Sequence, residues 1–344
     1  MTQPLVSILV TTYNHAAYLE QALDSVRAQT SGDFELVITD DCSTDDSASV
    51  IQAWLERTGM PADFVVNERN LGICASRNRA LARSSGRFVC CLSGDDWYEA
   101  DRVRLQSAFL LTEPDDVAAV YSDVRLVAPD GTVRAESYMG ESTRRQGPPE
   151  GWVFEPMHRA CFVAATGVMV RRSAIEAVGG YDEDLLFEDW DMWLRLADRY
   201  RFRYLDAVVA NRRELPTSLF HAGFRTAPLQ LSVIRIQEKW LDRDEVARLQ
   251  SARAIRRAAL VVAGQDRRAA RAALGRVAAV PGRGRLGWNA LEAMLAIPGT
   301  GRLVPAARQW RARTHGMVEA ERGAWRSGSR LPRRVQRTRG AGSH

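Results

Sequence analysis

Cysteine is scarce in this sequence: there are five residues among 344, an odd number, with no CxxC spacing. A disulfide framework needs paired cysteines and a structural zinc site needs clustered ones, so neither is expected to organise the fold. Most of the five lie in or beside apolar runs, which is typical of buried thiols in a reducing compartment. The cysteine content therefore predicts a cytoplasmic protein.

Long apolar runs are missing as well. No stretch reaches the ~18 uninterrupted apolar residues of a membrane span, so no span is expected. The first apolar run, 5–10, is only as long as a strand and no basic segment precedes it, so we expect no signal peptide.

Charge is unevenly distributed along the chain. The net charge is +5, but residues 251–344 hold 20 arginines and 4 acids, a net of +16, which leaves −11 for residues 1–250. Three interpretations of the basic end are open: it contacts the inner face of an anionic membrane, it contacts a polyanion, or it is a solvated helical appendage. No recognition motif or interleaved aromatic residue favours nucleic acid, so nucleic acid is not expected as a partner.

Strand-length apolar runs alternate with segments of helical periodicity. The predicted strands are 5–12, 34–39, 64–67 and 87–92, with predicted helices at 16–29, 47–57 and 75–84. This alternation predicts an α/β fold with a doubly wound, mostly parallel sheet. Polar clusters at 11–14, 40–46 and 93–96 each follow a strand, and such sheets bind ligands beyond the carboxyl ends of their strands. We therefore expect one ligand site at this edge.

The remaining sequence predicts more strands and then a helical region. Further predicted elements are a helix at 101–113, a strand at 117–121, a hairpin at 124–134, a mobile loop at 136–151, strands at 163–171 and 202–209, a helix at 187–196, and helices from 231. We expect an α/β domain at 1–225, a helical C-terminal region at 226–322 and a disordered basic tail at 323–344.

Five motifs follow one another within about 4–218. In sequence order they are VSILVTTYNHAAYLEQALDSVRAQT, ELVITDDCSTDDS, NLGICASRNRAL, SGDDW and GGYDEDLLFEDWDMWLRLA. Their order and spacing resemble glycosyltransferase family 2. The resemblance implies a single GT-A (Rossmann-like) domain, a nucleotide-sugar donor and inversion of the anomeric centre. No Gln-x-x-Arg-Trp motif is present, which argues against a processive polysaccharide synthase.

Four residues match family positions that bind the donor. Tyr13 can stack on a base, Thr11 lies beside it, and Asp41 can accept a hydrogen bond from the base. Arg77 matches a position near the donor phosphates. The alternatives are a core aromatic for Tyr13, a turn and helix cap for Asp41, and a surface arginine for Arg77.

The adjacent carboxylates of Asp95 and Asp96 suggest a site for Mg²⁺ or Mn²⁺, because hard cations prefer carboxylate oxygens. By the resemblance, Asp96 is the direct ligand and Asp95 contacts ribose or supports the metal. The alternative is a turn that caps the helix starting near Asp101. Family members often carry an Arg-x-His segment after the last strand, and Glu214 stands where that histidine would be, as a candidate ligand.

Asp189 matches the position of the family's catalytic base, which takes the proton of the attacking hydroxyl. Glu188 and Asp191 are instead typical of acids that the helix dipole favours. Trp190 and Trp193 fit either an acceptor-sugar site or the core.

Together these residues predict a metal-dependent, inverting hexosyltransferase that uses a nucleotide-diphosphate sugar. The expected acceptor is a hydroxyl of a glycan or lipid-linked intermediate in cell-envelope polysaccharide synthesis. Two alternatives remain: a sugar-phosphate nucleotidyltransferase, and a catalytically silent nucleotide-sugar-binding or scaffold protein. The absence of the first acid of an Asp-x-Asp triplet keeps the silent protein open.

Overall fold

The structure is a computed structural model that describes residues 3–186, 188–216 and 226–280. The chain divides into two units. The first comprises Met1–Tyr138 and Pro149–Gly301. The described part of the second is Met139–Pro148, which contains the short helix α5 (Glu141–Gln146).

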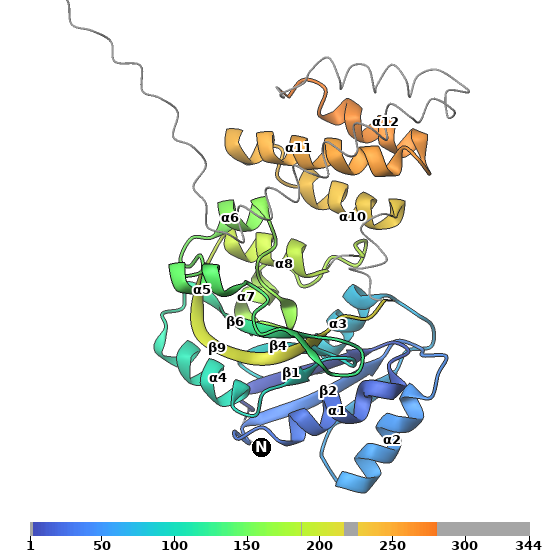
Figure 1. Ribbon diagram of the computed structural model, residues 1–344, viewed down its shortest axis with the longest axis vertical. Helices are drawn as coiled ribbons and strands as arrows, with labels where there is room; N and C mark the ends of the chain where they lie inside the picture. The colour runs from blue at the N-terminus through green and yellow to red at the C-terminus, as the bar shows by residue number, and fades with distance from the viewer. Residues whose placement is uncertain (1–2, 187, 217–225, 281–344) are drawn as a thin grey trace, which may run out of the picture. The chain divides into compact units, whose positions relative to one another are not determined.

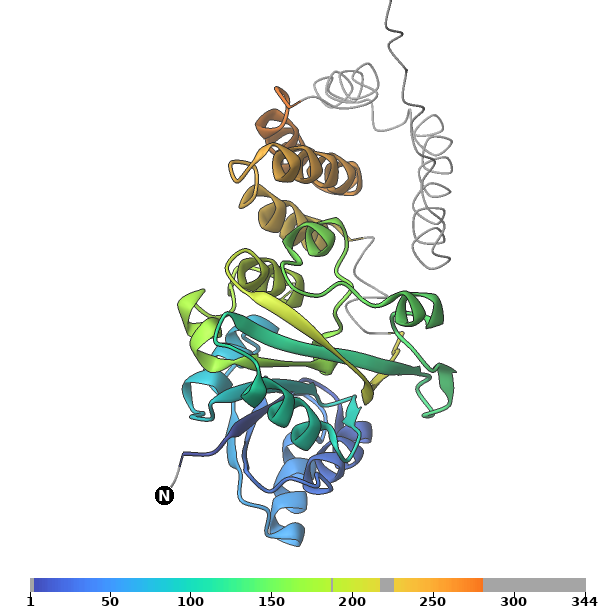
Figure 2. The ribbon, with the colours of Figure 1, turned by 90° about the vertical axis from the view of Figure 1, so that its left-hand side faces the viewer.

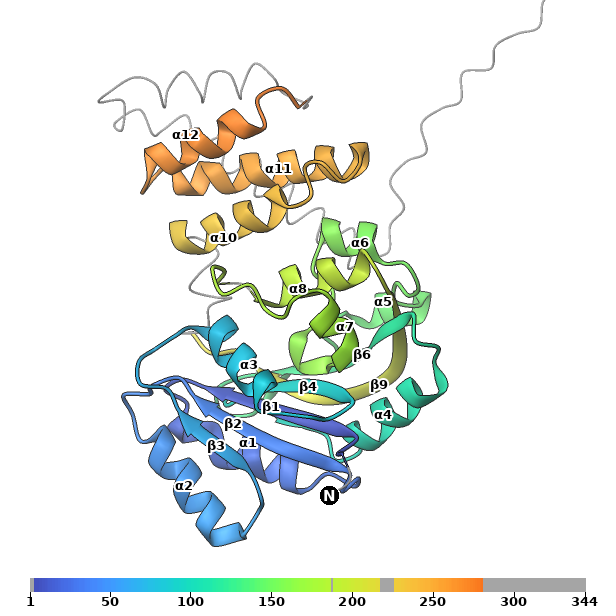
Figure 3. The same ribbon diagram turned by 180° about the vertical axis from the view of Figure 1, so that it is seen from behind.

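The first half of the larger unit is a parallel sheet built from strand–helix repeats (Figures 1 and 3). Its strands run in the order β3-β2-β1-β4. They are β1 (Val6–Thr12), β2 (Phe34–Asp40), β3 (Asp63–Val66) and β4 (Phe88–Ser93), connected by α1 (Ala16–Arg27), α2 (Ser47–Thr58) and α3 (Ile73–Ala82). Every residue of β1 is buried, which explains its near-continuous apolar sequence.

The second half of the sheet is mixed. The order continues as β8-β6-β9-β5, with β8 antiparallel to both β4 and β6, and β6 parallel to β9. These strands are β5 (Trp97–Tyr98), β6 (Val117–Val127), β8 (Val168–Arg171) and β9 (Arg201–Arg213), and β7 (Val133–Ala135) pairs with β6. The associated helices are α4 (Arg102–Thr112), α6 (Phe154–Arg159), α7 (Arg172–Ala177) and α8 (Glu188–Ala197), with a 3₁₀ turn at Ala165–Gly167.

Among the described residues, the helices that follow the sheet are drawn from yellow to orange in Figure 2. They are α10 (Ala227–Glu238), α11 (Glu245–Val262) and α12 (Arg267–Arg276), and they share an apolar core that includes Ile234, Ile255 and Leu274. In the described residues, no helix has the length and apolarity needed to cross a membrane. The predicted tail at 323–344, and the predicted helical region beyond residue 280, lie outside the described residues.

The expected α/β class with a largely parallel sheet and C-terminal helices is confirmed. The strand β9 runs four residues past its predicted end at 209, and α5 lies inside the segment 136–151 that was predicted to be a loop. Both β5 and α6 were not predicted, because elements of two and six residues are too short to show a periodicity.

Candidate functional site

Strand register brings the polar clusters to one edge of the sheet. Thr11 of β1 lies beside Thr39 of β2 on one side and Ser93 of β4 on the other. Parallel neighbours end at the same edge, so the turns that follow these strands must converge there. The three clusters found in the sequence therefore lie at one edge of the sheet.

Hydrogen bonds link the turn after β1 to the loop after β2. Asn14 adopts the left-handed conformation (φ 58°), and its Oδ1 accepts a hydrogen bond from the Thr44 backbone N–H at 2.7 Å. The Asn14 backbone N–H donates to the Ser43 hydroxyl at 2.9 Å. Asp40 accepts from both the backbone N–H and the hydroxyl of Ser43. These bonds fix the loop that carries Asp41.

Asp41 organises the entry to α3. Its carboxylate accepts hydrogen bonds from the Asn67 side chain at 2.7 Å and from the backbone N–H groups of Leu71 and Gly72 at 2.8 and 2.9 Å. Asp41 therefore fixes the loop before α3, although neither α2 nor α3 has a side-chain cap hydrogen bond. Tyr13, by contrast, is 42% exposed, so its ring is available for stacking, and the nearby hydroxyl of Thr11 is buried without a hydrogen-bond partner.

Asp95 and Asp96 lie side by side and are both buried. Asp96 accepts hydrogen bonds from the Arg213 backbone N–H at 2.8 Å and from the Thr166 hydroxyl at 2.6 Å. Burial, and then the charge of Asp95, raise the pKa of Asp96 to about 7. The Ser93 hydroxyl donates to Asp95 at 2.5 Å.

These two carboxylates suit a divalent cation that takes most of its other ligands from a bound phosphate group and water. Within the described residues each Asp96 oxygen accepts one hydrogen bond, and a buried carboxyl whose pKa is raised, as that of Asp96 is, gains stability from a nearby positive charge. Glu214 follows Arg213 in the chain and forms an ion pair with Arg134 at 3.5 Å. Among the described residues, no three His, Cys, Asp or Glu side chains are grouped as a metal site. A Mg²⁺ site in proteins needs only one or two carboxylates, because phosphate and water supply its other ligands.

The first turn of α8 carries Glu188 and Asp189. Burial, and then the charge of Glu188, raise the pKa of Asp189 to about 7, although Arg77 and Arg212 act in the opposite direction. Cys161 is close enough for Asp189 to raise the pKa of its thiol, after burial as the main cause. A carboxyl with a pKa near neutrality is suited to accept a proton at physiological pH.

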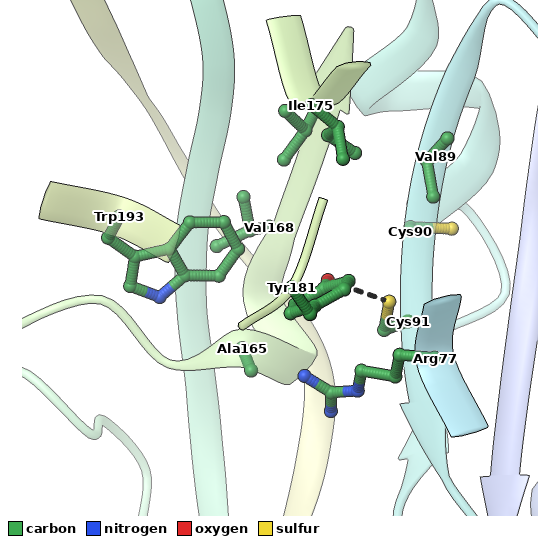
Figure 4. A pocket seen from close by; sticks show the side chains of 10 residues that line it. Arg77, Val89, Cys90, Cys91, Ala165, Val168, Ile175, Tyr181 and Trp193 are labelled. Atoms are coloured by element: carbon green, nitrogen blue, oxygen red, sulfur yellow. Dashed lines mark hydrogen bonds between the residues drawn. The ribbon is translucent and has the colours of Figure 1, made fainter. Parts of the chain in front are cut away.

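Arg77 is 5% exposed, so the surface-arginine alternative is wrong. Its guanidinium forms a 2.9 Å ion pair with Glu188 and lies over the Tyr181 ring, 5.6 Å from its centroid. Figure 4 shows Arg77 beside Tyr181 and Cys91 at a cavity of about 10 Å³. The arginine that the sequence associates with donor phosphates thus contacts the segment that carries Asp189.

Arg212 carries a positive charge that influences the site, and it was not singled out from the sequence. Burial lowers the pKa of Arg212, but the nearby groups of Tyr138, Asp96, Asp189 and Glu214 raise it above its usual value. The positive charge of Arg212 therefore acts on the pKa of both Asp96 and Asp189. Its position in the sequence could have indicated this, because Arg212 lies at the polar end of β9, two residues before Glu214.

The two tryptophans of α8 differ in their environment. Trp193 is 4% exposed and packs edge-on against Phe202, so it belongs to the core. Trp190 is half-buried, and its indole N–H donates to the Met157 carbonyl at 2.8 Å. His15, in the turn after β1, lies with Nδ1 3.9 Å from Asp95 Oδ1.

Gly94→Ala is expected to impair the carboxylate turn. A Cβ on Gly94 would lie 2.5 Å from the Thr12 hydroxyl and 3.1 Å from His15 Nδ1, so the turn before Asp95 must move. We expect turnover to fall at least tenfold, since a 1 Å displacement can reduce a rate by about 10². Gly86→Ala is the control: it meets the Ser7 backbone at 2.5 Å, at the opposite end of β1. Gly86→Ala should act mainly on Tm and only slightly on turnover per folded molecule. If turnover per folded molecule fell equally in both variants, this role of Gly94 would be contradicted.

Comparison with known proteins places this geometry in a family. The profile described as "Glycosyl transferase family 2" matches residues 7–179, half of the chain. The chain belongs to glycosyltransferase family 2. The matched region contains β1 to β8, and so includes Tyr13, Asp41 and Asp96 but not Asp189.

Two curated relatives of this family 2 glycosyltransferase are similar over part of their length. A Bacillus subtilis (strain 168) glycosyltransferase named for teichuronic acid biosynthesis, TuaG, is 35% identical over 130 residues, which are 38% of this chain and 50% of TuaG. Chondroitin synthase of Pasteurella multocida (strain Pm70) is 30% identical over 210 residues, 61% of this chain and 20% of that protein. The chain thus spans half or less of these relatives.

Solved structures share the GT-A fold. A Pyrobaculum calidifontis mannosyltransferase in complex with GDP-Man and Mn²⁺ has a TM-score of 0.55 at 20% identity, covering 88% of this chain and 83% of that one. S. aureus TarS 1–349 in complex with UDP-GlcNAc has a TM-score of 0.58 at 16% identity, covering 84% and 90%. At these identities the likeness concerns the fold, and the expected GT-A class is confirmed.

Proposed function

We propose that this family 2 glycosyltransferase is a metal-dependent, inverting hexosyltransferase that moves a sugar from a nucleotide-diphosphate donor to a hydroxyl acceptor. The observation that carries the proposal is the convergence of the polar turns after β1, β2 and β4 at one edge of the sheet, with Asp95 and Asp96 buried there. A transferase of this kind needs a cation-holding carboxylate at the leaving group and a base at the acceptor, near one another. Asp96 is buried and Asp189 is half-buried, and each is a carboxyl with a raised pKa, as these two roles require.

Donor binding divides along the sheet edge. Tyr13 stacks on the base, Thr11 and Asp41 contact the nucleoside, and Asp95 contacts ribose or supports the cation. Asp96, with Glu214 as second carboxylate, would hold Mg²⁺ or Mn²⁺, which supplies Lewis-acid stabilisation to the departing diphosphate.

Asp189 accepts the proton from the acceptor hydroxyl as its oxygen attacks the anomeric carbon. A single base suffices when attack comes from the face opposite the diphosphate, and that geometry inverts the anomeric centre. Arg77 contributes through its ion pair with Glu188, and Arg212 supplies positive charge that acts on both carboxyls.

The acceptor is proposed to be a glycan or lipid-linked intermediate of cell-envelope polysaccharide synthesis. The support is the name of TuaG, which refers to teichuronic acid biosynthesis, together with the polysaccharide named in chondroitin synthase. The nucleotidyltransferase alternative lacks support, because residues 13–18 after β1 offer no glycine-rich loop with a basic residue.

The proposal is tested by incubating the protein with UDP-, GDP-, dTDP- and CDP-sugars, with Mn²⁺ or with EDTA, and measuring release of the nucleoside diphosphate. We expect release from one nucleotide class in Mn²⁺ only. NMR of the transferred or hydrolysed sugar should show the anomeric configuration opposite to that of the donor. No release from any donor would favour the catalytically silent alternative.

We further propose the domain division at 1–225 and 226–322.

We also propose a peripheral position at the inner face of the membrane. Exposed residues of α11 and α12 support this position: Arg253, Arg257, Arg268 and Arg271 are exposed, and Val246 is 49% exposed. Asp266 is the one acid in 251–280, and it caps α12 by accepting from the Ala269 N–H at 2.9 Å. Exposed arginines with an apolar neighbour suit an anionic lipid surface.

Sedimentation with lipid vesicles tests this basic face. We expect binding to phosphatidylglycerol vesicles and not to phosphatidylcholine, with loss of at least half of the bound fraction in the double variant Arg268→Gln/Arg271→Gln. Arg104→Gln, an exposed arginine of α4, serves as the control. Equal binding of both lipids, or of the double variant and the wild type, would contradict the proposal.

A further inference from the structure

The segment that carries Asp189 is held by a helix outside the region that matches the family. Residues 181–186 and 188–191 will be called the base segment; they follow the family match, which ends at 179. We infer that α10, with its capping residue Lys239, is a positioning element of the active site that fixes the base segment. The inference rests on the proposed function only in that Asp189 is the base.

Lys239 makes the central contact. Its Nζ lies 2.6 Å from Asp182 Oδ2 and 2.7 Å from Asp191 Oδ1, so one ammonium joins both ends of the base segment. Asp191 is fully buried and also accepts from Arg195 Nε at 2.7 Å. Ion pairs to a buried carboxylate are screened far less than surface pairs, so this contact constrains the segment.

Two more residues on the same face of α10 act on the middle of the base segment. The Ser232 hydroxyl accepts a hydrogen bond from the Leu186 backbone N–H at 3.0 Å, and Arg235 Nη1 donates to the Asp184 carbonyl at 2.8 Å. Positions 232, 235 and 239 are spaced i, i+3 and i+7, which places them along one side of a helix. The bonds of Ser232 and Arg235 satisfy backbone groups of the part of the base segment that precedes α8, which is neither helix nor strand.

Helix α3 holds the base segment through other residues. Asn78 Nδ2 donates to the Tyr181 carbonyl at 2.8 Å, the Cys74 thiol donates to the Leu185 carbonyl at 3.1 Å, and Arg77 pairs with Glu188. The base segment is therefore fixed from the donor-binding domain by α3 and from the C-terminal helices by α10. This makes the C-terminal helices part of the catalytic geometry rather than an appendage.

The test compares Lys239→Met with Lys239→Arg. We expect Lys239→Met to lower kcat about 10- to 100-fold, as displacement of a catalytic group does, with little change in the KM of the donor. Lys239→Arg keeps a cation in reach of both carboxylates and should retain at least a third of wild-type kcat. Asp191 keeps its pair with Arg195 in both variants, so neither leaves a buried charge unpaired.

Arg243→Met is the matched control, because Arg243 Nε pairs with Asp198 at 2.6 Å, just past the end of α8 and away from the base segment. Peptide-level hydrogen exchange gives a readout independent of activity. Exchange in the base segment should rise about tenfold in Lys239→Met and stay unchanged in Arg243→Met. Unchanged exchange in Lys239→Met, or equal effects of both variants on kcat, would overturn the inference. If the protein has no transferase activity, the proposed function fails while the exchange result still decides the role of α10.

Discussion

Asp189→Asn is expected to lower kcat by about 10²- to 10⁴-fold, the range in which general-base catalysis contributes. Asparagine keeps the size and the hydrogen-bond acceptor that the Trp190 backbone N–H uses at 2.7 Å, but it cannot take a proton. The loss should therefore appear in kcat, with nucleotide binding unchanged. Steady-state kinetics with saturating donor and acceptor measure it.

Asp184→Asn is the control for this change, because Asp184 is an exposed acid of the same segment. It should keep wild-type kcat within about twofold, as expected of a surface substitution. Activity in Asp189→Asn that matched the control would remove Asp189 from the reaction.

The raised pKa of Asp189 also sets the direction of the pH dependence. Only the ionised carboxylate can act as a base, so kcat should increase with pH through about 7 and level off above it. Glu188→Gln removes a charge that raises this pKa, second to burial, so the midpoint should move to lower pH. A midpoint that did not move would mean that Glu188 has no influence on the base.

Asp96→Asn is expected to abolish Mn²⁺-dependent donor binding while making the protein more stable at pH 8. Asparagine can still accept from the Arg213 N–H and donate to the Thr166 hydroxyl. It no longer offers the charged oxygens that a divalent cation requires. Donor affinity in Mn²⁺ should fall at least tenfold, to the value that the wild type shows in EDTA.

The stability change follows from the raised pKa of Asp96, about 7. The folded protein binds this proton more tightly than the unfolded chain, so the carboxyl stabilises the fold below pH ~4, and this contribution disappears as pH rises through 7. Asp96→Asn should therefore raise Tm at pH 8, by about 2–4 °C for each kcal/mol regained, and change it little at pH 4. A lower Tm at pH 8 would contradict the description of Asp96 as an unfavourably buried charge.

Much of the sheet could be predicted because burial on both faces leaves a direct trace in the sequence. The runs that became β1, β2 and β4 are apolar and of strand length, and each ends in polar residues. The edge where these polar residues meet followed from topology alone. The end of β9 was not predicted, since Asn211–Arg213 are polar residues that pair with β6 and approach Asp96.

The roles of single charged residues were harder to predict, because their partners lie far away in the chain. Arg77 appeared to be either a phosphate ligand or a surface residue, whereas it pairs with Glu188. No role was predicted for Lys239, yet it forms ion pairs with both Asp182 and Asp191. Sequence periodicity predicts which face of a helix is buried. It does not predict which residue of another element will contact a given side chain.

Calorimetric titration of the wild type and Asp96→Asn with nucleoside diphosphates, in Mn²⁺ and in EDTA, tests the central claim most directly. The account predicts that one of UDP, GDP, dTDP and CDP binds the wild type at least tenfold more tightly in Mn²⁺, and that Asp96→Asn loses this gain. Equal affinity with and without Mn²⁺, or a full metal effect in Asp96→Asn, would contradict the assignment of Asp96 to the diphosphate end of the donor site.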